Sequence, residues 1–374
     1  MRAVPKKLGR RELGRFALSS GLSLGLFTFA GVGTSIVIGG CTHGTGGVGP
    51  GGATGALRTA FPLSSPVRHV QVWSCFDLPR DDSRSRELSG IAWHEESRTL
   101  WAVQDELASI VPIRPDATLE RWTFGDAIKL DVTGPLDLEG IAITKDGFLL
   151  ASEAGPRIID VDRNGRYRRD VTPPAKFMEA LHNKSFESLA LDPQKAVLYT
   201  TSETALPRDD GAAKDGSGAR VRIVRKDLAS GEVREHAYAA DAVVTGGGDY
   251  GVSDLAALAT DDLLVLERGF RKGIGNSIRI YRVDLTGSDS VCSAIEQLSS
   301  EVAVLSKTLV VDLSKLPFAL ASTPRQPQPT PLMENYEGIA IGPRLPDGRL
   351  ALVLVSDDNG SAKQTARVLT LALS

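Results

Sequence analysis

Hydrophobic residues are concentrated in short paired segments that recur along the chain. In one copy, Glu139–Ile143 alternates apolar and small residues, and after a polar turn Phe148–Glu153 is almost wholly apolar. A period of two predicts a β-strand, and a continuous apolar run of this length is typical of a strand buried on both faces. Each pair therefore predicts an antiparallel hairpin. The five copies begin at Glu87, Glu139, Glu187, Asp254 and Glu337.

The spacing of the copies predicts the fold. Successive copies begin 52, 48, 67 and 83 residues apart, and a four-stranded propeller blade takes about 40–50 residues. We therefore predict an all-β fold, a β-propeller of five or six blades, whose two wide intervals hold insertions or one degenerate blade. A two-sheet sandwich would not place acids equally in every copy. Val67–Phe76 should pair with Ala366–Leu373 to close the ring. The apolar spacing within Cys292–Leu305 predicts a short helix.

Each copy carries an acidic residue at both ends. The first strand opens with an acid and the second closes with one, and these two positions share one edge of an antiparallel hairpin. In a ring, ten carboxylates would then gather on one face. The second-strand acids are Asp105, Glu153, Glu203, Glu267 and Asp357.

Crowded carboxylates need a cation or basic side chains to neutralise them. Calcium binds about six to eight oxygen ligands in flexible geometry, so it is the predicted cofactor. The first-strand acids have a structural alternative, since they can accept hydrogen bonds from neighbouring backbone N–H groups. The predicted catalytic residues are Glu267, Asp357 and Arg268, with Arg268 binding phosphate. The predicted metal ligands are Glu87, Asp105, Glu139, Glu153, Glu187, Glu203, Asp254, Glu337 and Asp358.

The N-terminal segment has the pattern of an export signal. Arg10-Arg11 is followed by the uncharged stretch 16–39, and Ile38-Gly-Gly-Cys41 resembles a bacterial lipobox. We predict a twin-arginine signal peptide over residues 1–40, lipidation of Cys41, a Gly-rich tether over 41–66 and the propeller over 67–374. The product would be an exported periplasmic or cell-envelope lipoprotein. An uncleaved transmembrane anchor is the alternative, because about 20 apolar residues can span a bilayer.

Charge, cysteines and missing motifs narrow the function. The formal net charge is −3, and residues 1–40 carry six basic groups and one acid, so the rest of the chain is acidic. This argues against a nucleic-acid partner, which needs a basic surface. Cys75 and Cys292 can form one disulfide or remain two thiols. Gly-x-Ser-x-Gly and His-Glu-x-x-His do not occur. We expect a monomer.

Several segments resemble the phytase-like family, also described as "esterase-like activity of phytase". They are the Glu-Gly-Ile-Ala repeats and the segments Leu266–Phe270, Ser306–Leu313, Asn335–Arg349 and Val355–Asn359. The resemblance covers about residues 68–374. It implies an exported bacterial β-propeller that hydrolyses small phosphoesters or esters, with calcium as a possible requirement.

Three functions remain open from the sequence. The first is a metal-dependent phosphoesterase or esterase that acts in the periplasm at an acidic channel mouth. The second is a non-catalytic propeller lipoprotein that binds a ligand or partner protein. The third is a lactonase-like hydrolase with a single metal in the channel. Fold alone does not distinguish them, because propellers host many functions.

Overall fold

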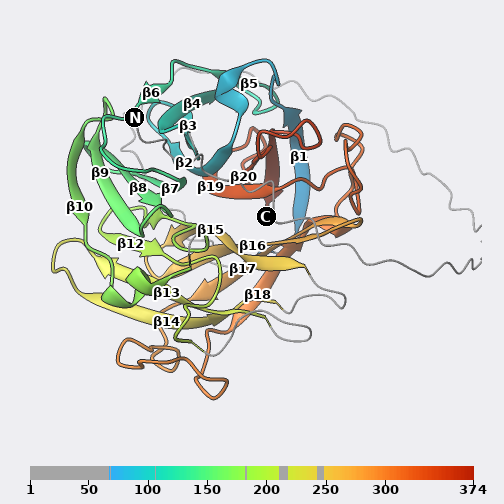
Figure 1. The fold of residues 1–374 in the computed structure, drawn as a ribbon. Coiled ribbons are helices and arrows are strands. Elements are labelled where there is room, and N and C mark those ends of the chain that lie inside the picture. The colour runs from blue at the N-terminus through green and yellow to red at the C-terminus, as the bar shows by residue number, and fades with distance from the viewer. Residues whose placement is uncertain (1–66, 68, 106, 182, 210–217, 242–247) are drawn as a thin grey trace, which may run out of the picture. The chain divides into compact units, whose positions relative to one another are not determined.

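Five small antiparallel sheets arranged in a ring make up the described part of the chain (Figure 1). The computed structural model describes residues 67, 69–105, 107–181, 183–209, 218–241 and 248–374. The predicted signal peptide, Cys41 and the tether lie outside these residues. Within them, no helix is long and apolar enough to cross a membrane. The prediction of a β-propeller is confirmed, with five blades.

The blades follow one another along the chain, each with its first strand innermost. The first blade contains β2 (Leu88–His94), β3 (Thr99–Gln104), β4 (Ser109–Pro115), β5 (Trp122–Phe124) and β6 (Ile128–Lys129). The second contains β7 (Leu138–Ile143), β8 (Gly147–Ser152), β9 (Arg157–Asp162) and β10 (Tyr167–Val171). The third contains β11 (Ala190–Leu191), β12 (Val197–Thr200), β13 (Arg220–Asp227) and β14 (Val233–Ala239).

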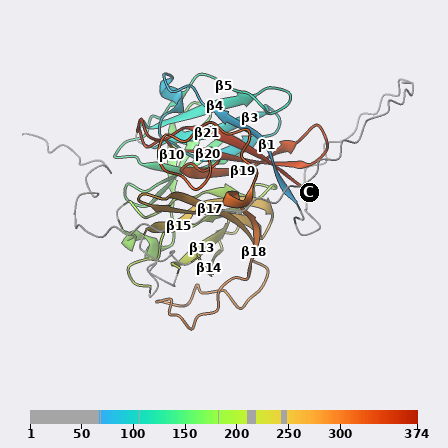
Figure 2. The ribbon, with the colours of Figure 1, turned by 90° about the vertical axis from the view of Figure 1, so that its right-hand side faces the viewer.

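The remaining two blades complete the ring. The fourth contains β15 (Asp249–Ala259), β16 (Asp262–Arg271), β17 (Gly275–Asp284) and β18 (Lys307–Asp312). The fifth contains β19 (Tyr336–Arg344), β20 (Leu350–Ser356), β21 (Arg367–Leu373) and β1 (Val70–Asp77). Short 3-10 turns cover Ser83–Ser85, Ala175–Glu179 and Leu313–Lys315. In Figure 2 the first and third blades lie on opposite sides of the ring.

The ring closes through β1, which pairs antiparallel with β21. The blue β1 therefore lies beside the red strands of the fifth blade (Figure 1). His69 and Ser374 continue the pairing with two backbone hydrogen bonds of 3.3 and 3.1 Å. The predicted pairing of Val67–Phe76 with Ala366–Leu373 is thus confirmed, and it removes an open sheet edge.

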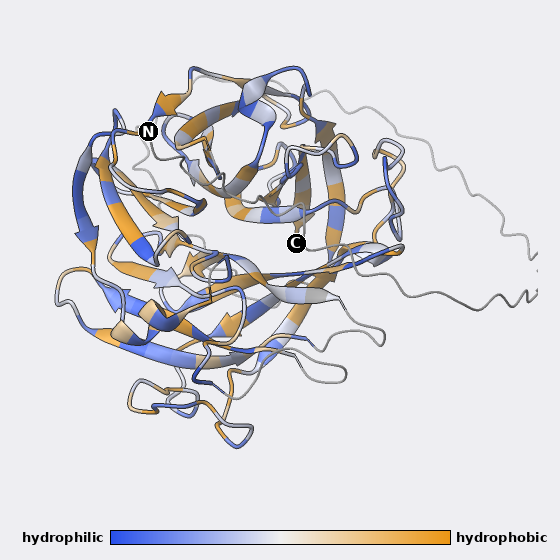
Figure 3. Ribbon diagram, viewed as in Figure 1, coloured by the Kyte–Doolittle hydropathy of each residue, from blue (hydrophilic) through white to orange (hydrophobic). Residues whose placement is uncertain are grey.

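Apolar side chains fill the spaces between neighbouring blades. Five clusters of buried residues each join two adjacent blades. Between the first and second blades, for example, Val103 and Ile110 pack in one cluster with Ile141 and Leu150. Strands near the axis are therefore apolar on both faces, whereas the outer β10 is largely exposed and hydrophilic (Figure 3). This explains the almost continuous hydrophobicity of the second strands.

The inner strands approach one another closely where the repeats carry glycine. A Cβ atom on Gly90 would lie 2.4 Å from the carbonyl oxygen of Glu139, and one on Gly338 would lie 2.7 Å from that of Ser89. A side chain at either position would collide with the backbone of the next blade. The glycine that precedes Ile-Ala in these copies is therefore required by blade packing.

The predicted helix over Cys292–Leu305 is wrong. This segment forms turns and bends that cross the outer edge of the third blade. The Cys292 N–H donates to the Glu235 carbonyl of β14 (2.7 Å), and the Leu305 N–H donates to the Ala237 carbonyl (2.8 Å). Pairing with a strand edge thus replaces helical hydrogen bonds, while Cys292 and Leu298 bury their side chains against Ala237.

The two described cysteines do not form a disulfide. Cys75 lies in β1 and Cys292 lies beside β14, and both are free thiols. Burial raises the pKa of each thiol to about 11. Of the two alternatives left open by the sequence, the structure has two reduced cysteines, and both are poor nucleophiles at neutral pH.

Candidate metal centre

A β-bulge interrupts the inner strand of each blade near the position of the predicted first-strand acid. In the second blade Leu138 pairs with Ser152 and Gly140 with Ala151, so Glu139 is the extra residue. Glu337 is the extra residue of the fifth blade. In the third blade the extra residue falls between Phe186 and Ala190, a span that contains Glu187. A bulge re-aims a side chain away from the regular ladder.

The first and fourth blades place serine at the bulge instead of an acid. Ser89 lies in the bulge of the first blade, and Glu87 lies two residues earlier, at the place that Asp137 occupies in the second blade. In the fourth blade Ser253 is the extra residue, and Asp254 pairs regularly with Leu266. Glu87 and Asp254 therefore occupy different positions from Glu139, although the repeat pattern equates them.

The second-strand acids lie next to the start of the inner strands. The Asp105 N–H donates to the Glu87 carbonyl (2.9 Å), and the Glu153 N–H donates to the Asp137 carbonyl (2.8 Å). The third and fifth blades repeat this contact from Glu203 to Ser185 (3.1 Å) and from Asp357 to Asn335 (2.9 Å). One backbone hydrogen bond thus fixes the second-strand acid in four blades.

Five carboxylates from the first three blades come together. Asp105, Asp137 and Glu139 each offer an oxygen within 4.8 Å of the other two, and so do Glu139, Glu153 and Glu187. We call these five residues the carboxylate cluster. Glu139, Glu153 and Glu187 are only 1%, 3% and 1% exposed, whereas Asp105 and Asp137 are half-buried.

Two oxygens of the carboxylate cluster lack a donor among the described residues. The Ser89 hydroxyl donates to Glu139 Oε2 (2.6 Å), and the Ser185 N–H donates to Glu153 Oε1 (3.1 Å). No N–H or O–H group of the described residues donates to the buried Glu153 Oε2 or Asp105 Oδ1. Buried acceptors of this kind are costly unless a proton or a cation satisfies them.

The protonation of the cluster shows the same electrostatic cost. The pKa of Asp105 is raised to about 12, first by burial and then by a hydrogen bond shared with Asp137 and by the charges of nearby carboxylates. The pKa of Glu153 is raised to about 8. Burial is the main cause, the charges of Glu139, Glu203 and Asp137 add to it, and a hydrogen bond shared with Glu187 opposes it. Bound protons reduce the repulsion, and a metal ion would do so more completely. The cluster can hold a metal ion.

Basic side chains neutralise the neighbouring acids. Arg268 Nη2 lies 3.2 Å from Glu203 Oε1 and 3.3 Å from Glu337 Oε1. Lys184 Nζ lies 2.9 Å from Glu203 Oε2. Arg268 is thus close to two of the predicted ligands, and Lys184 is a site residue that the sequence did not indicate. Glu203 and Glu337 thus take part in ion pairs, in contrast to Asp105, Asp137 and Glu153.

Asp254 and Glu267 lie apart from the carboxylate cluster. Asp254 accepts backbone hydrogen bonds from Leu255 and Ile339, each 2.8 Å long, and burial raises its pKa well above the usual value. Glu267 is fully buried and accepts from four donors: the Tyr238 hydroxyl, the Tyr250 hydroxyl (3.1 Å), the Asp241 N–H (3.0 Å) and Lys307 Nζ (2.7 Å). Both residues connect neighbouring blades.

The last two predicted residues lie near the junction of the fifth and first blades. Asp357 accepts from the Asn359 N–H (2.7 Å), and its charge raises the pKa of Asp105. Asp358 accepts from the N–H groups of Glu87 (3.1 Å) and Gly360 (3.0 Å). Asp357 therefore borders the carboxylate cluster, while Asp358 orders the loop beside it.

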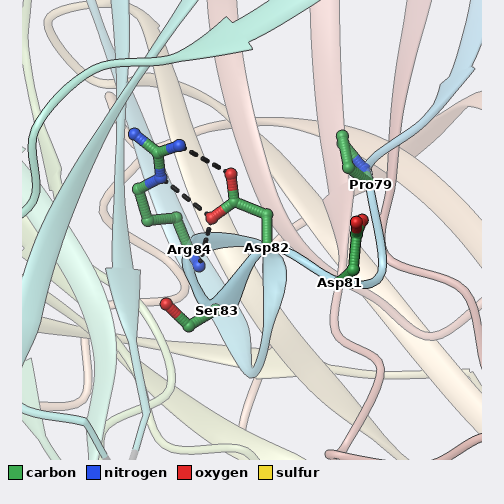
Figure 4. Close-up of a pocket in the computed structure, with 5 residues that line it drawn as sticks. All are labelled: Pro79, Asp81, Asp82, Ser83 and Arg84. Carbon is green, nitrogen blue, oxygen red and sulfur yellow. Dashed lines mark hydrogen bonds and ion pairs between the residues drawn. The ribbon is translucent and has the colours of Figure 1, made fainter.

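A surface hollow lies outside the carboxylate cluster. It is lined by Pro79, Asp81, Asp82, Ser83 and Arg84, in the connection between β1 and β2 (Figure 4). Arg84 Nη2 lies 2.6 Å from Asp82 Oδ2, so the charges of these two residues neutralise each other. It contains none of the sequence-predicted site residues.

The fold and the cluster define a five-bladed β-propeller with a buried acidic centre that can hold a metal ion. Residues 84–360 match the phytase-like family, described as "Esterase-like activity of phytase". The chain belongs to this family. No curated protein matches the sequence.

Several solved structures match this chain at low sequence identity. A protein from Lactobacillus plantarum is 12% identical, with 72% of this chain and 64% of that chain covered and a TM-score of 0.34. This chain thus spans less than two thirds of that protein. An endo-arabinase from Bacteroides thetaiotaomicron is 12% identical, covering 79% and 96%, with a TM-score of 0.41. A luciferin-regenerating enzyme is 14% identical, covering 80% and 94%, with a TM-score of 0.34.

Proposed function

We propose that this protein is an exported, calcium-dependent hydrolase of small phosphate esters. The carboxylate cluster carries the proposal, because it places buried oxygen acceptors beside basic side chains at one mouth of the ring. Membership of the phytase-like family supports ester hydrolysis as the reaction class. We further propose that lipid on Cys41 holds the protein, a monomer, at the periplasmic face of a membrane.

The donor set fits calcium. The cluster offers only carboxylate oxygens, and hard cations such as calcium prefer oxygen to nitrogen or sulfur ligands. The unsatisfied Oε2 of Glu153 is a ready ligand atom. When bound, the cation would polarise a phosphoryl oxygen and lower the pKa of a coordinated water. Glu139, Glu153 and Glu187 would hold it away from bulk solvent.

Arg268 supplies the complementary anion contact. Its guanidinium bridges Glu203 and Glu337, and its side chain is 11% exposed. Glu203 is close enough to the cluster that its charge raises the pKa of Glu153. A phosphate group entering the mouth would meet Arg268, whose planar donors match phosphoryl oxygens. Lys184 is the second cation beside Glu203, with 32% exposure.

Hydrolysis of p-nitrophenyl phosphate and p-nitrophenyl acetate tests the proposal. With the full chain we expect phosphate-ester turnover in calcium and its loss in excess chelator. Glu153→Gln should lower kcat/KM at least about tenfold, because metal sites are sensitive to changes in ligand chemistry. The exposed Glu120→Gln is the matched control. Thermal unfolding would verify that both variants fold.

Arg268→Gln separates phosphate recognition from general esterase activity. Loss of charged hydrogen bonds worth about 1.5–3 kcal/mol should reduce kcat/KM for the phosphate ester by about 10–150-fold, with a much smaller effect on the acetate. The exposed Arg121→Gln is the control. If neither ester turns over although calcium binds, the protein is a binding propeller. Hydrolysis of lactones alone, independent of Arg268, would identify a lactonase-like enzyme instead.

A further inference from the structure

We propose that Glu139 is a bridging ligand shared by two neighbouring cation positions. Asp105 and Asp137 complete the first position, and Glu153 and Glu187 complete the second. The inference rests on the metal binding in the proposed function and deepens it, since paired cations are a recurrent arrangement in phosphoester hydrolysis.

The shape of the cluster supports two positions. Its five carboxylates do not form one group in which all oxygens are mutually close; they form two triads, each within 4.8 Å, that have Glu139 in common. A carboxylate has two oxygens with about four lone-pair directions, so it can bind two ions at once. Glu139 is the residue at the β7 bulge, which directs it between the two pairs.

Each triad contains a buried oxygen without a donor. In the second triad this atom is Oε2 of Glu153, a residue that is only 3% exposed. In the first triad it is Oδ1 of Asp105. These two orphaned acceptors belong to different triads, so a single ion placed in one triad would leave the other acceptor unsatisfied.

The charge distribution leads to the same conclusion. Asp105, Asp137 and Glu153 form no ion pair with any described lysine or arginine. Once a bound cation displaces their protons, these three carboxylates carry more negative charge than one divalent ion can balance, and they are divided between the two triads. Ser89 stands where Glu139 stands in the next blade, and its hydroxyl holds Glu139 Oε2 at 2.6 Å. Ser89 thereby acts as a positioning residue for the bridge.

Equilibrium dialysis with calcium alone tests the bridge by counting ions per chain. The wild-type full chain should bind two calcium ions. Asp137→Asn should retain one, Glu187→Gln should retain one, and the double variant should retain none. Glu139→Gln should weaken both positions at least about tenfold. Glu120→Gln is the control and should retain two.

The outcomes separate the bridge from the proposed function. One calcium ion in the wild type, with calcium-dependent hydrolysis intact, would overturn the bridge and leave the function standing. Two ions that respond to the variants as expected, without any ester hydrolysis, would support the bridge and overturn the function. If Glu139→Gln fails to fold by thermal unfolding, the two single variants and their double variant still decide the number of positions. No bound calcium would overturn both.

Discussion

Glu153 and Glu267 occupy the same place in the repeat and have opposite surroundings. Each ends the predicted second strand of its hairpin, and each is almost completely buried, at 3% and 0% exposure. Glu267 accepts hydrogen bonds from two tyrosines, a backbone N–H and Lys307. Glu153 accepts one backbone hydrogen bond, lies among other acids and keeps an oxygen without a donor.

The difference shows that position in the repeat does not determine chemistry. The adjoining blade supplies Tyr238 and Asp241 to Glu267 and supplies Glu187 to Glu153. A buried acid surrounded by matched donors is a structural lock, because its charge is already compensated. A buried carboxylate beside other carboxylates is electrostatically unfavourable until a proton or a cation binds, and this favours a binding site.

The largest expected effect is on the lock around Glu267. Lys307→Met removes the ammonium that lies 2.7 Å from Glu267 and 2.7 Å from Asp241. Leaving a buried carboxylate without its cation should lower the free energy of unfolding by about 3–5 kcal/mol. Denaturant unfolding with and without calcium would measure it, with the exposed Lys272→Met as control. A loss below 1 kcal/mol would contradict the structural role.

A smaller effect per pH unit is expected at Glu153 in chelator. Its pKa is raised from 4.5 to about 8 in the folded chain, so the folded state holds the proton more tightly than the unfolded state. This contribution to stability is complete below about pH 4.5 and is lost as the pH rises through about 8. One such group changes stability by at most about 1.4 kcal/mol per pH unit.

Glu153→Gln should flatten that pH dependence, because an amide does not titrate. Denaturant midpoints measured between these pH values would give the slope for the variant and the wild type. Calcium should flatten the wild-type curve as well, since it replaces the proton. Identical slopes in chelator would show that the pKa of Glu153 is not raised in the folded chain.

The smallest effect is expected from Ser89→Ala. The substitution removes the hydroxyl that donates to Glu139 Oε2, at a cost of about 0.5–1.5 kcal/mol. The same change should weaken calcium binding, because Glu139 loses the group that orients it. Ser253→Ala, at the bulge of the fourth blade, is the matched control and should leave calcium affinity unchanged. Equal losses of affinity in the two variants would argue against a specific role for Ser89.

Sequence periodicity predicted the ring but not the details of its centre. The repeat predicts the strand pairing and the closure by Val67–Phe76. It also predicts that Glu153 and Glu203 lie beside the inner strands, because identical hairpins place equivalent residues at equivalent edges. The offset of Glu87 and Asp254 does not follow, because a bulge moved by one residue changes which side chain faces the mouth. The repeat pattern was aligned on its acids, so it did not reveal that Ser89 and Ser253 occupy the bulge in the first and fourth blades.

Asp137 was missed for the same reason. It lies two residues before Glu139, where the first copy carries Glu87, and aligning Ser89 with Glu139 would have revealed the match. Lys184 and Lys307 were missed because they belong to no repeated motif and reach the acids only through tertiary contacts. Ion pairs between distant segments leave no local signal in one sequence.

The pairing of β1 with β21 has a consequence for how the protein is made. Within the fifth blade Arg367 binds Asp77 across 290 residues of chain, whereas each of the other four blades is drawn from one continuous segment. During synthesis, those four blades can therefore form as they emerge from the ribosome, whereas β1 stays unpaired until β21 has been made. Truncation before Arg367 should leave an open ring with unpaired strand edges, which would promote edge-to-edge association with other truncated chains.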